Sequence, residues 1–418
     1  MRTKRWWLLA MWLVGISSLA AAESDPNLNP PRLVVHEWGT FTTMQGSDGV
    51  TLEGLHHDEE QLPRFVYSRD LLNPEEVAMR ESAFNKMETP VTYFYPSQPM
   101  RVRVRVRFPA GILTQWYPNV RHFVPELAED GGPKLELKNG VLDWGEVNLL
   151  AGGVEAESLL PPVGADDPWV YARQTDAALV QVNDWQPSRG YSKQTEKYLF
   201  YRGLGRCEMP LRAITRKGGA LELRNTSSNA LRHVFVLRVE DGLGTFQYVS
   251  ELAGGAQLER SIPMPADAPD LPIHAARLRE KLEEALTACG LYPKEARAMA
   301  LTWNRSYFHT PGLRVLYVLP DELTRAILPL EVEPAPQETV RVMVARLECL
   351  TPEQEDRVAD AVPQLDAPDF ERRDAANRTL RELGRYAEPN LRRVLSKAEA
   401  PELRARVQRL LQRFEPLK

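Results

Sequence analysis

The stretch LVVHEWGTFTTMQGSDG, residues 33–49, decides how the chain folds, because it is the first segment able to form a buried strand. If residues 33–41 are extended, their side chains alternate between two faces. His36 and Trp38 then share one face, and Glu37 lies on the other. The Ser-Asp-Gly that follows predicts a tight turn, since Asp-Gly accepts positive φ.

His36 has two interpretations. In the first, it belongs to a functional site walled by Trp38, with Thr40 nearby. In the second, it is a core histidine whose ring is hydrogen-bonded to a backbone carbonyl. Because neighbouring side chains of a strand diverge, His36 and Glu37 cannot act on one substrate atom unless a bulge turns one of them. His36 and Glu37 are therefore separate catalytic candidates.

Residues 35–42, VHEWGTFT, resemble a signature of exported bacterial proteins of unknown function. Other stretches resemble the same group, and the resemblance spans about residues 33–350. They are KMETPVTYFY at 86–95, FYRGLG at 200–205, WNRSYF at 303–308 and GLRVLYVLP at 312–320. The group brings no assigned activity, so the resemblance selects residues to test and implies no reaction.

The N-terminus predicts export. Residues 1–22 have the form of a signal peptide, with a basic start, an apolar run over 6–16 and a small-residue cleavage site near Ala22. The run is short for a membrane span, and no later stretch is apolar enough to be one. We expect a periplasmic or secreted protein without a transmembrane segment, or alternatively an uncleaved anchor. The polar residues 23–32 form a disordered lead-in.

The composition excludes few classes of protein or partner. The 418 residues are 43% hydrophobic and 26% charged, which is ordinary for a globular protein. The net charge of −5 argues against nucleic acid as the main partner. Three cysteines allow at most one disulfide, and none lies in a CxxC pair. We expect buried, inert thiols, with one bridge as the alternative. The sequence indicates no particular cofactor.

The fold class is predicted to be α+β. Residues 33–262 carry strand signals at short intervals, which favours an antiparallel sandwich or barrel. Residues 134–137 are among the strand candidates within them. After a linker, residues 273–350 are predicted to form an α+β block packed on the β domain. Residues 351–418 resemble one to two units of a HEAT-type helical repeat, which indicates a small helical cap or a site for a protein partner.

The strand RVRVRVRF, residues 101–108, alternates almost perfectly. Its valines are predicted to face the core. Its arginines, Arg101, Arg103, Arg105 and Arg107, then form a row that suits an anionic glycan. The alternative is a solvated row paired with acidic residues across the sheet.

Three further stretches of the sequence have the chemistry of a site. Glu88 is a candidate general acid or base if burial raises its pKa, or a partner for an arginine. His56 and His57, with His36, are candidate metal ligands, although no two-histidine helical spacing is present and a solvated acidic loop is the simpler account. In WNRSYF, Trp303 is predicted to be core, and Asn304 and Arg305 are candidate binding residues.

Two functions fit these patterns. The first is an exported binding or scaffold protein of the cell envelope or extracellular space, because no specific catalytic motif is present. The second is a periplasmic or secreted hydrolase, with or without a divalent metal, in which His36, His56 or His57, Glu88 and the Asn304–Arg305 pair converge on one pocket. The two differ in geometry, because catalytic groups must reach the reacting atom directly or through one water.

Overall fold

The computed structural model describes residues 31–54, 61–69, 82–125, 136–151, 157–186, 190–262, 264–265 and 267–414. The predicted signal peptide, most of the predicted lead-in and the candidate ligands His56 and His57 lie outside the described residues. Residues 32–418 form one compact unit.

Strand β1 (Leu33–Gln45) lies in the middle of a nine-stranded sheet, sheet A. On one side it pairs antiparallel with β3 (Asn85–Pro96), and on the other it pairs parallel with β18 (Glu338–Cys349). Beyond β3 lie β10 (Leu199–Gly205), β5 (Gly111–Tyr117) and β2 (Tyr67–Ser68). Beyond β18 lie β16 (Gly312–Val318), β13 (Leu231–Glu240) and β14 (Leu243–Leu252).

This order differs from the expected domain division. Strands β16 and β18 come from the α+β block, yet they lie between β13 and β1 of the same sheet. The block therefore completes the sheet instead of packing on it, and its last strand forms a parallel pair in a sheet that is otherwise antiparallel. Local periodicity identified these strands but carries no information about a partner so distant in the sequence.

Two smaller sheets face sheet A across the main apolar core. Sheet B contains β17 (Leu330–Glu333), β4 (Met100–Phe108), β7 (Gly140–Leu150), β8 (Leu179–Gln186), β9 (Gly190–Glu196) and β6 (His122–Val124). Sheet C contains β11 (Leu211–Thr215), β12 (Ala220–Asn225) and β15 (Gln257–Ser261). The alternation of β4 is as predicted, since its valines enter the core and its arginines are exposed. Residues 136–137, the described part of one expected strand, are not a strand.

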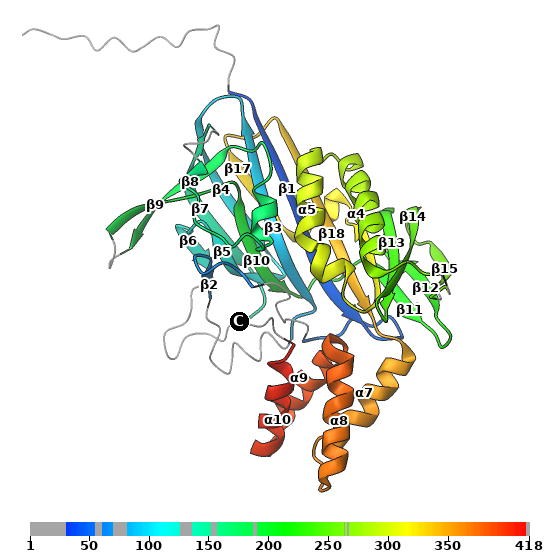
Figure 1. The fold of residues 1–418 in the computed structure, drawn as a ribbon. Helices are drawn as coiled ribbons and strands as arrows, with labels where there is room; N and C mark the ends of the chain where they lie inside the picture. Colours follow the sequence, from blue (N-terminus) through cyan, green and yellow to red (C-terminus); the bar gives the residue numbers. More distant parts are fainter. Residues whose placement is uncertain are drawn as a thin grey trace, which may run out of the picture. The chain divides into compact units, whose positions relative to one another are not determined.

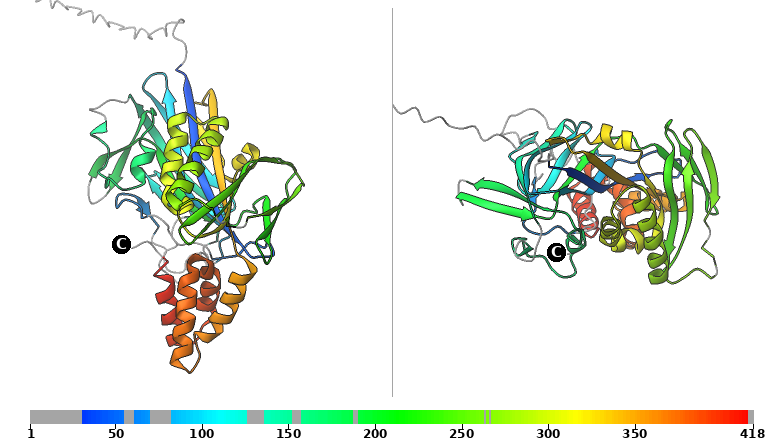
Figure 2. Two further views of the ribbon diagram at one scale, coloured as in Figure 1. Left: turned by 45° about the vertical axis from the view of Figure 1, so that its right-hand side comes forward. Right: turned by 90° about the horizontal axis from the view of Figure 1, so that it is seen from above.

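Helices cover the other face of sheet A. Helix α4 (Leu271–Ala288) ends before Gly290, which has a φ of 103°, and α5 (Pro293–Trp303) begins at a proline, both as predicted. Helix α5 continues into a π-helix, η1 (Asn304–Phe308), and the short α3 (Trp169–Ala172) lies beside it. Figures 1 and 2 show α4 and α5 lying over β1 and β18. Their apolar faces and the facing strands form a second core.

The C-terminal region is helical, as predicted. It contains α7 (Pro352–Gln364), α8 (Phe370–Leu383), the 3-10 helix η2 (Gly384–Ala387), α9 (Glu388–Lys397) and α10 (Pro401–Leu411), around a core of their own. Thr351 caps α7, and Gly384 ends α8 with a φ of 55°. The remaining helix, α6 (Asp321–Ile327), precedes β17. The chain is thus α+β, with several antiparallel sheets and a helical C-terminal region.

A buried ionic cluster joins sheet A to the C-terminal helices. Glu348 of β18 is fully buried and lies within 3.3 Å of guanidinium nitrogens of Arg314, Arg346 and Arg385. The Tyr386 hydroxyl donates a hydrogen bond of 2.9 Å to the same carboxylate. Arg385 and Tyr386 belong to η2, so this buried carboxylate helps to hold the C-terminal helices to the sheet, together with the hydrogen bonds from Ser47 to Glu355 of α7.

The cysteines are free thiols, and no helix in the described part of the chain has the length and apolar character that a membrane span needs. Burial raises the pKa of the Cys207 thiol to about 12, which makes it a poor nucleophile at neutral pH.

His274 gives the fold a specific pH dependence. It is buried in α4 against Gly244 of β14, and burial, followed by the charges of Arg314 and His309, lowers its pKa to about 4. The unfolded chain takes up this proton near pH 6.5, so stability is lost as pH falls from about 6.5 to 4, by at most about 3 kcal/mol. We expect His274→Leu to flatten urea-derived unfolding free energies across this window, and His122→Ala, at an exposed site, to leave the slope unchanged. Equal slopes for all three proteins would contradict the prediction.

Candidate functional site

Four of the stretches that carry the family resemblance meet at one small pocket, the aromatic pocket, of about 40 Å³. Strand β1 contributes Trp38, β3 contributes Glu88 and Thr89, β10 contributes Phe200 and Arg202, and the α5–η1 junction contributes Trp303, Ser306 and Tyr307. Trp169 of α3 and Tyr198 complete the aromatic lining. Four stretches that are far apart in the sequence therefore contribute to one site, together with α3 and residues 61–62.

An irregularity in sheet A turns Glu88 toward this pocket. Trp38 pairs with Val91 but Thr40 pairs with Glu88, so two residues of β3, Thr89 and Pro90, lie opposite the single residue Gly39. Such a bulge reverses the alternation of side chains beyond it. Without it, Glu88 would point into the core between the sheets. Thr89 has a φ of 51°, an uncommon conformation for a β-branched residue.

The helix above the bulge is also irregular. Residues 304–308 form a π-helix, a feature often found at functional sites. The Trp303 indole NH donates a 3.1 Å hydrogen bond to the Thr89 hydroxyl, and the Trp303 and Tyr307 rings stack with centroids 5.0 Å apart. Because strained backbone persists only where its surroundings impose it, two such segments in direct contact mark this junction as the candidate site.

Glu88 is held firmly in place. Its carboxylate accepts hydrogen bonds of 2.9 Å from the hydroxyls of Thr42 and Tyr307, and it forms an ion pair of 3.0 Å with Lys86. Burial and the Glu88 charge raise the pKa of Tyr307, so its hydroxyl stays protonated and donates. Both carboxylate oxygens are engaged. This geometry suits a fixed polar wall better than a group that transfers protons.

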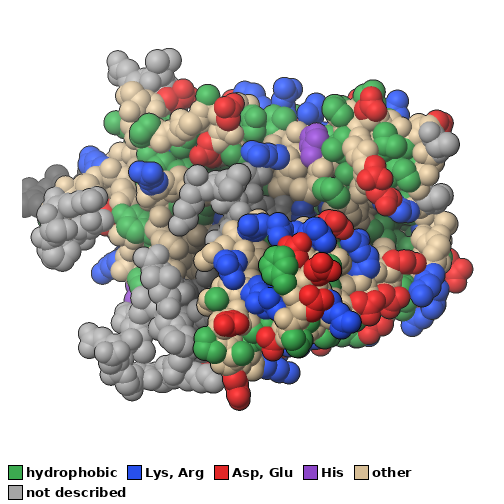
Figure 3. Space-filling model, turned by 60° about the horizontal axis from the view of Figure 1, so that its bottom comes forward, with side chains coloured by type: hydrophobic (Ala, Val, Ile, Leu, Met, Phe, Trp, Pro, Cys, Tyr) green, Lys and Arg blue, Asp and Glu red, His purple; other side chains and the backbone are tan. Residues whose placement is uncertain are grey.

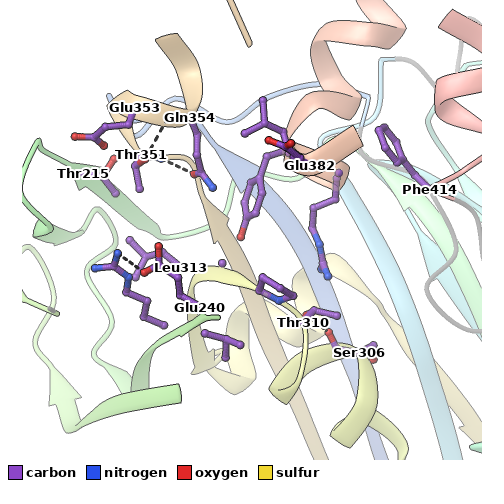
Figure 4. A pocket seen from close by; sticks show the side chains of 18 of the residues that line it. Thr215, Glu240, Ser306, Thr310, Leu313, Thr351, Glu353, Gln354, Glu382 and Phe414 are labelled. Atoms are coloured by element: carbon purple, nitrogen blue, oxygen red, sulfur yellow. Dashed lines mark hydrogen bonds and ion pairs between the residues drawn. The ribbon is translucent and has the colours of Figure 1, made fainter. Parts of the chain in front are cut away.

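The aromatic pocket adjoins a much larger cavity, the arginine cleft, of about 1270 Å³. The two share Gln61, Asp167, Pro168 and Ser306 in their linings. The cleft lies between the β strands and the C-terminal helices. Figure 4 shows Ser306 and Thr310 on one side of it, across from Glu382 and Phe414. The aromatic pocket is therefore a recess in the wall of a long cleft.

Seven arginines line the cleft, together with four acidic residues. Two of the acidic residues are already neutralised, because Arg238 pairs with Glu240 and Arg357 with Glu382, both at 2.6 Å. Among the described residues, Arg305, Arg381 and Arg413 have exposed guanidinium groups without an acidic partner. Because Asp167 and Glu353 also line the cleft, these three arginines give it a small excess of positive charge.

His36 lies elsewhere on β1. Its Nδ1 donates a 2.7 Å hydrogen bond to Glu295, which also accepts from the Tyr95 hydroxyl at 2.8 Å and from the backbone NH of Tyr292. The ring is buried, as the second interpretation predicts, but its partner is a carboxylate at the start of α5 and not a backbone carbonyl. His36 is four residues from Thr40, the partner of Glu88, or about 13 Å along the strand.

Glu37 points to the opposite face, as the alternation predicts. Arg341 Nε donates a hydrogen bond of 2.7 Å to its carboxylate, and Nη2 of the same guanidinium forms an ion pair with it at 2.6 Å. The Tyr201 and Thr92 hydroxyls donate at 2.6 and 2.9 Å. Every polar atom of the Glu37 carboxylate is thus satisfied inside the main core, where it has no access to the cleft. Its role is to stabilise the fold.

The arginine row of β4 is charge-paired. Arg101 and Arg103 lie 4.0 Å from Glu146, and Arg105 lies 2.6 Å from Asp143 of the neighbouring β7. Arg107 pairs with Glu331 on β17. The acidic partners come from the strands on either side, which is the alternative that the sequence left open. Because its arginines have acidic partners, the row attracts an anionic ligand less strongly than its sequence suggests.

The hydrolase candidates do not converge in the described part of the chain. His36 and Glu88 lie in separate hydrogen-bonded clusters, and no group of three or more potential metal ligands occurs among the residues that the structure describes. Asn304 begins the π-helix, and only Arg305 of that pair lines the cleft. Sequence reasoning missed Thr89, Arg202, Arg381 and Arg413, although the first two stand in the quoted stretches.

No family model and no curated protein matches the chain. Among solved structures, it is similar to the yeast delta-COP-I mu-homology domain, alone and complexed with a Dsl1 WxWxV peptide. In both comparisons identity is 8%, with 76% of this chain and 96% of the other covered, and the TM-scores are 0.26 and 0.25. Likeness at this level supports no inference about fold or function.

Proposed function

We propose that the protein is an exported binding protein whose ligand is a saccharide carrying acidic groups, held in the arginine cleft with one neutral substituent in the aromatic pocket. The observation that carries this proposal is the continuity of an aromatic recess with a cleft that has uncompensated arginines. We also interpret the three sheets as a sandwich-like body and the C-terminal helices as a HEAT-type unit.

The charge pattern supports an acidic ligand. Guanidinium groups bind carboxylates and phosphates through paired hydrogen bonds, and Arg305, Arg381 and Arg413 lack an acidic partner among the described residues. The carboxylates of Asp167 and Glu353 also line the cleft. A ligand with acidic groups at intervals therefore fits better than one that is uniformly anionic.

The dimensions support an oligomer. The cleft exceeds the range of about 300–1,000 Å³ that is typical of small-molecule sites. The aromatic pocket has room for about one or two water molecules, so it admits only a substituent the size of a hydroxymethyl group. Glu88 on one wall and the hydroxyl of Ser306 on another give such a group both an acceptor and a donor.

The proposal of export rests on the N-terminal sequence and on the resemblance to exported proteins. It is tested separately, by fractionating cells that produce the full chain and measuring the mass of the mature protein. A mass that corresponds to cleavage near Ala22, in the fraction outside the inner membrane, is the expected result. Full-length protein in the cytoplasm would contradict it.

Ligand binding is tested by titration calorimetry with an oligogalacturonate, a neutral galactan fragment of the same length and polyglutamate. We expect the oligogalacturonate to bind most tightly. The triple variant Arg305→Gln, Arg381→Gln, Arg413→Gln is expected to weaken it at least about tenfold, a loss of about 1.4 kcal/mol.

The matched control removes the same charge from the paired row, with Arg101→Gln, Arg103→Gln and Arg105→Gln. It is expected to leave the affinity within about twofold, because those arginines already have acidic partners. Equal losses of affinity in the two triple variants would show that the oligogalacturonate does not bind in the cleft. Polyglutamate binding that is tighter than that of the saccharide and is weakened by Arg305→Gln alone, a residue that lines the cleft and not the α8–α10 groove, would overturn the ligand class.

A further inference from the structure

The C-terminal helices have a second basic surface, the α8–α10 groove, with a volume of about 310 Å³. Five arginines line it, and Phe370 stands at one end with 70% of its surface exposed. The arginines are Arg373, Arg381, Arg406, Arg409 and Arg413. Basic side chains, with acidic ones among them, cover the face of these helices seen in Figure 3.

The positive charge of this groove is largely uncompensated. Arg373 donates to the carbonyls of Ala367 and Pro368, Arg406 to that of Leu365 and Arg409 to that of Ala405. These acceptors fix the side chains but carry no net charge. The one acidic residue in the lining, Asp374, already pairs with Arg378 at 3.2 Å.

The shape of the groove favours a polypeptide chain. From Phe370 to Arg381 the α8 wall is about 16 Å long, the span of about five extended residues. A channel between two helices admits a single chain, whereas a flat layer of lipid headgroups would reach only its rim. The guanidinium of Arg373 lies 5.9 Å from the centre of the Phe370 ring, and the exposed remainder of that ring offers a contact to an apolar side chain of the peptide.

We propose that the α8–α10 groove binds an acidic peptide segment of a partner protein, with glutamates or aspartates against its arginines and one apolar residue against Phe370. This site is separate from the proposed saccharide site, although Arg381 and Arg413 line both. Arg409 and Phe370 belong to the groove alone, which lets the two proposals be tested apart.

The test is fluorescence polarisation of a labelled glutamate-rich peptide with a single tryptophan, added to the full mature protein. The double variant Phe370→Ser, Arg409→Glu is expected to bind this peptide at least tenfold more weakly, and its oligogalacturonate titration should not change. Both side chains are exposed, so thermal unfolding followed by circular dichroism should match that of the parent protein.

The matched control is Arg372→Glu, Arg393→Glu, which reverses two charges outside the groove lining on α8 and α9. It is expected to retain the parent affinity for the peptide. Equal weakening by both double variants would show a diffuse charge effect and overturn the site. Stronger binding to phosphatidylglycerol vesicles than to the peptide, lost in the same groove variant, would make the occupant a lipid and overturn the proposal.

Discussion

Replacing Glu37 by glutamine is expected to lower the free energy of unfolding by about 3–5 kcal/mol. The change keeps the shape of the side chain but leaves the buried guanidinium of Arg341 without its counter-charge. Glutamine also cannot accept all the hydrogen bonds that Tyr201, Thr92 and Arg341 donate to the carboxylate. Urea denaturation of the single variant measures the loss.

Two further variants serve as controls for this result. Glu146→Gln removes an exposed carboxylate that lies 4.0 Å from its arginines, and it should cost less than about 1 kcal/mol. Adding Arg341→Met to Glu37→Gln removes the stranded charge and should recover part of the loss. If Glu37→Gln proves as mild as Glu146→Gln, the buried cluster does not stabilise the fold as described.

Replacing Glu348 by glutamine is expected to cost about 3–5 kcal/mol as well, with a local signature. Arg314 and Arg346 are fully buried and would keep their charges, while Arg385 and Tyr386 would lose the acceptor that holds η2 to β18. The C-terminal helices should therefore loosen before the sheets unfold. Hydrogen exchange measured by mass spectrometry should show faster exchange in α8, η2 and α9 than in β1.

The control for this variant is Glu382→Gln, in which an exposed pair with Arg357 is broken within the C-terminal helices. Its exchange should match that of the parent protein, because an exposed ion pair contributes less than about 1 kcal/mol. Uniform acceleration over all sheets in Glu348→Gln would mean that the cluster supports the whole fold and not the junction.

Local patterns in the sequence predicted much of the fold. The alternation in residues 101–108 gave a strand with the right faces, and Gly290 and Pro293 gave the ends of two helices. Each of these features depends on residues within one turn or one strand. The parallel pairing of β1 with β18 has no such local cause, so the sequence predicted the strand and not its neighbour.

The candidate site was predicted only in part for the same reason. Trp38, Glu88 and Arg305 were named from their residue types, but the bulge at Thr89 that aims Glu88 depends on the surrounding strands. The row of arginines was named from its charge alone, and its partner Glu331 lies far away in the sequence. Charge on one strand predicts a binding surface poorly until the neighbouring strands are known.

The parallel pair at the centre of sheet A also affects when this protein can fold. Val34 pairs with Glu338, about three hundred residues later, so β1 has one edge unpaired until almost the whole body has been synthesised. Closure of the long loop between β1 and β18 is slow, and one edge of β1 stays exposed in the incomplete chain. During synthesis β1 therefore stays accessible to chaperones for longer than a strand whose two partners are its neighbours in the sequence.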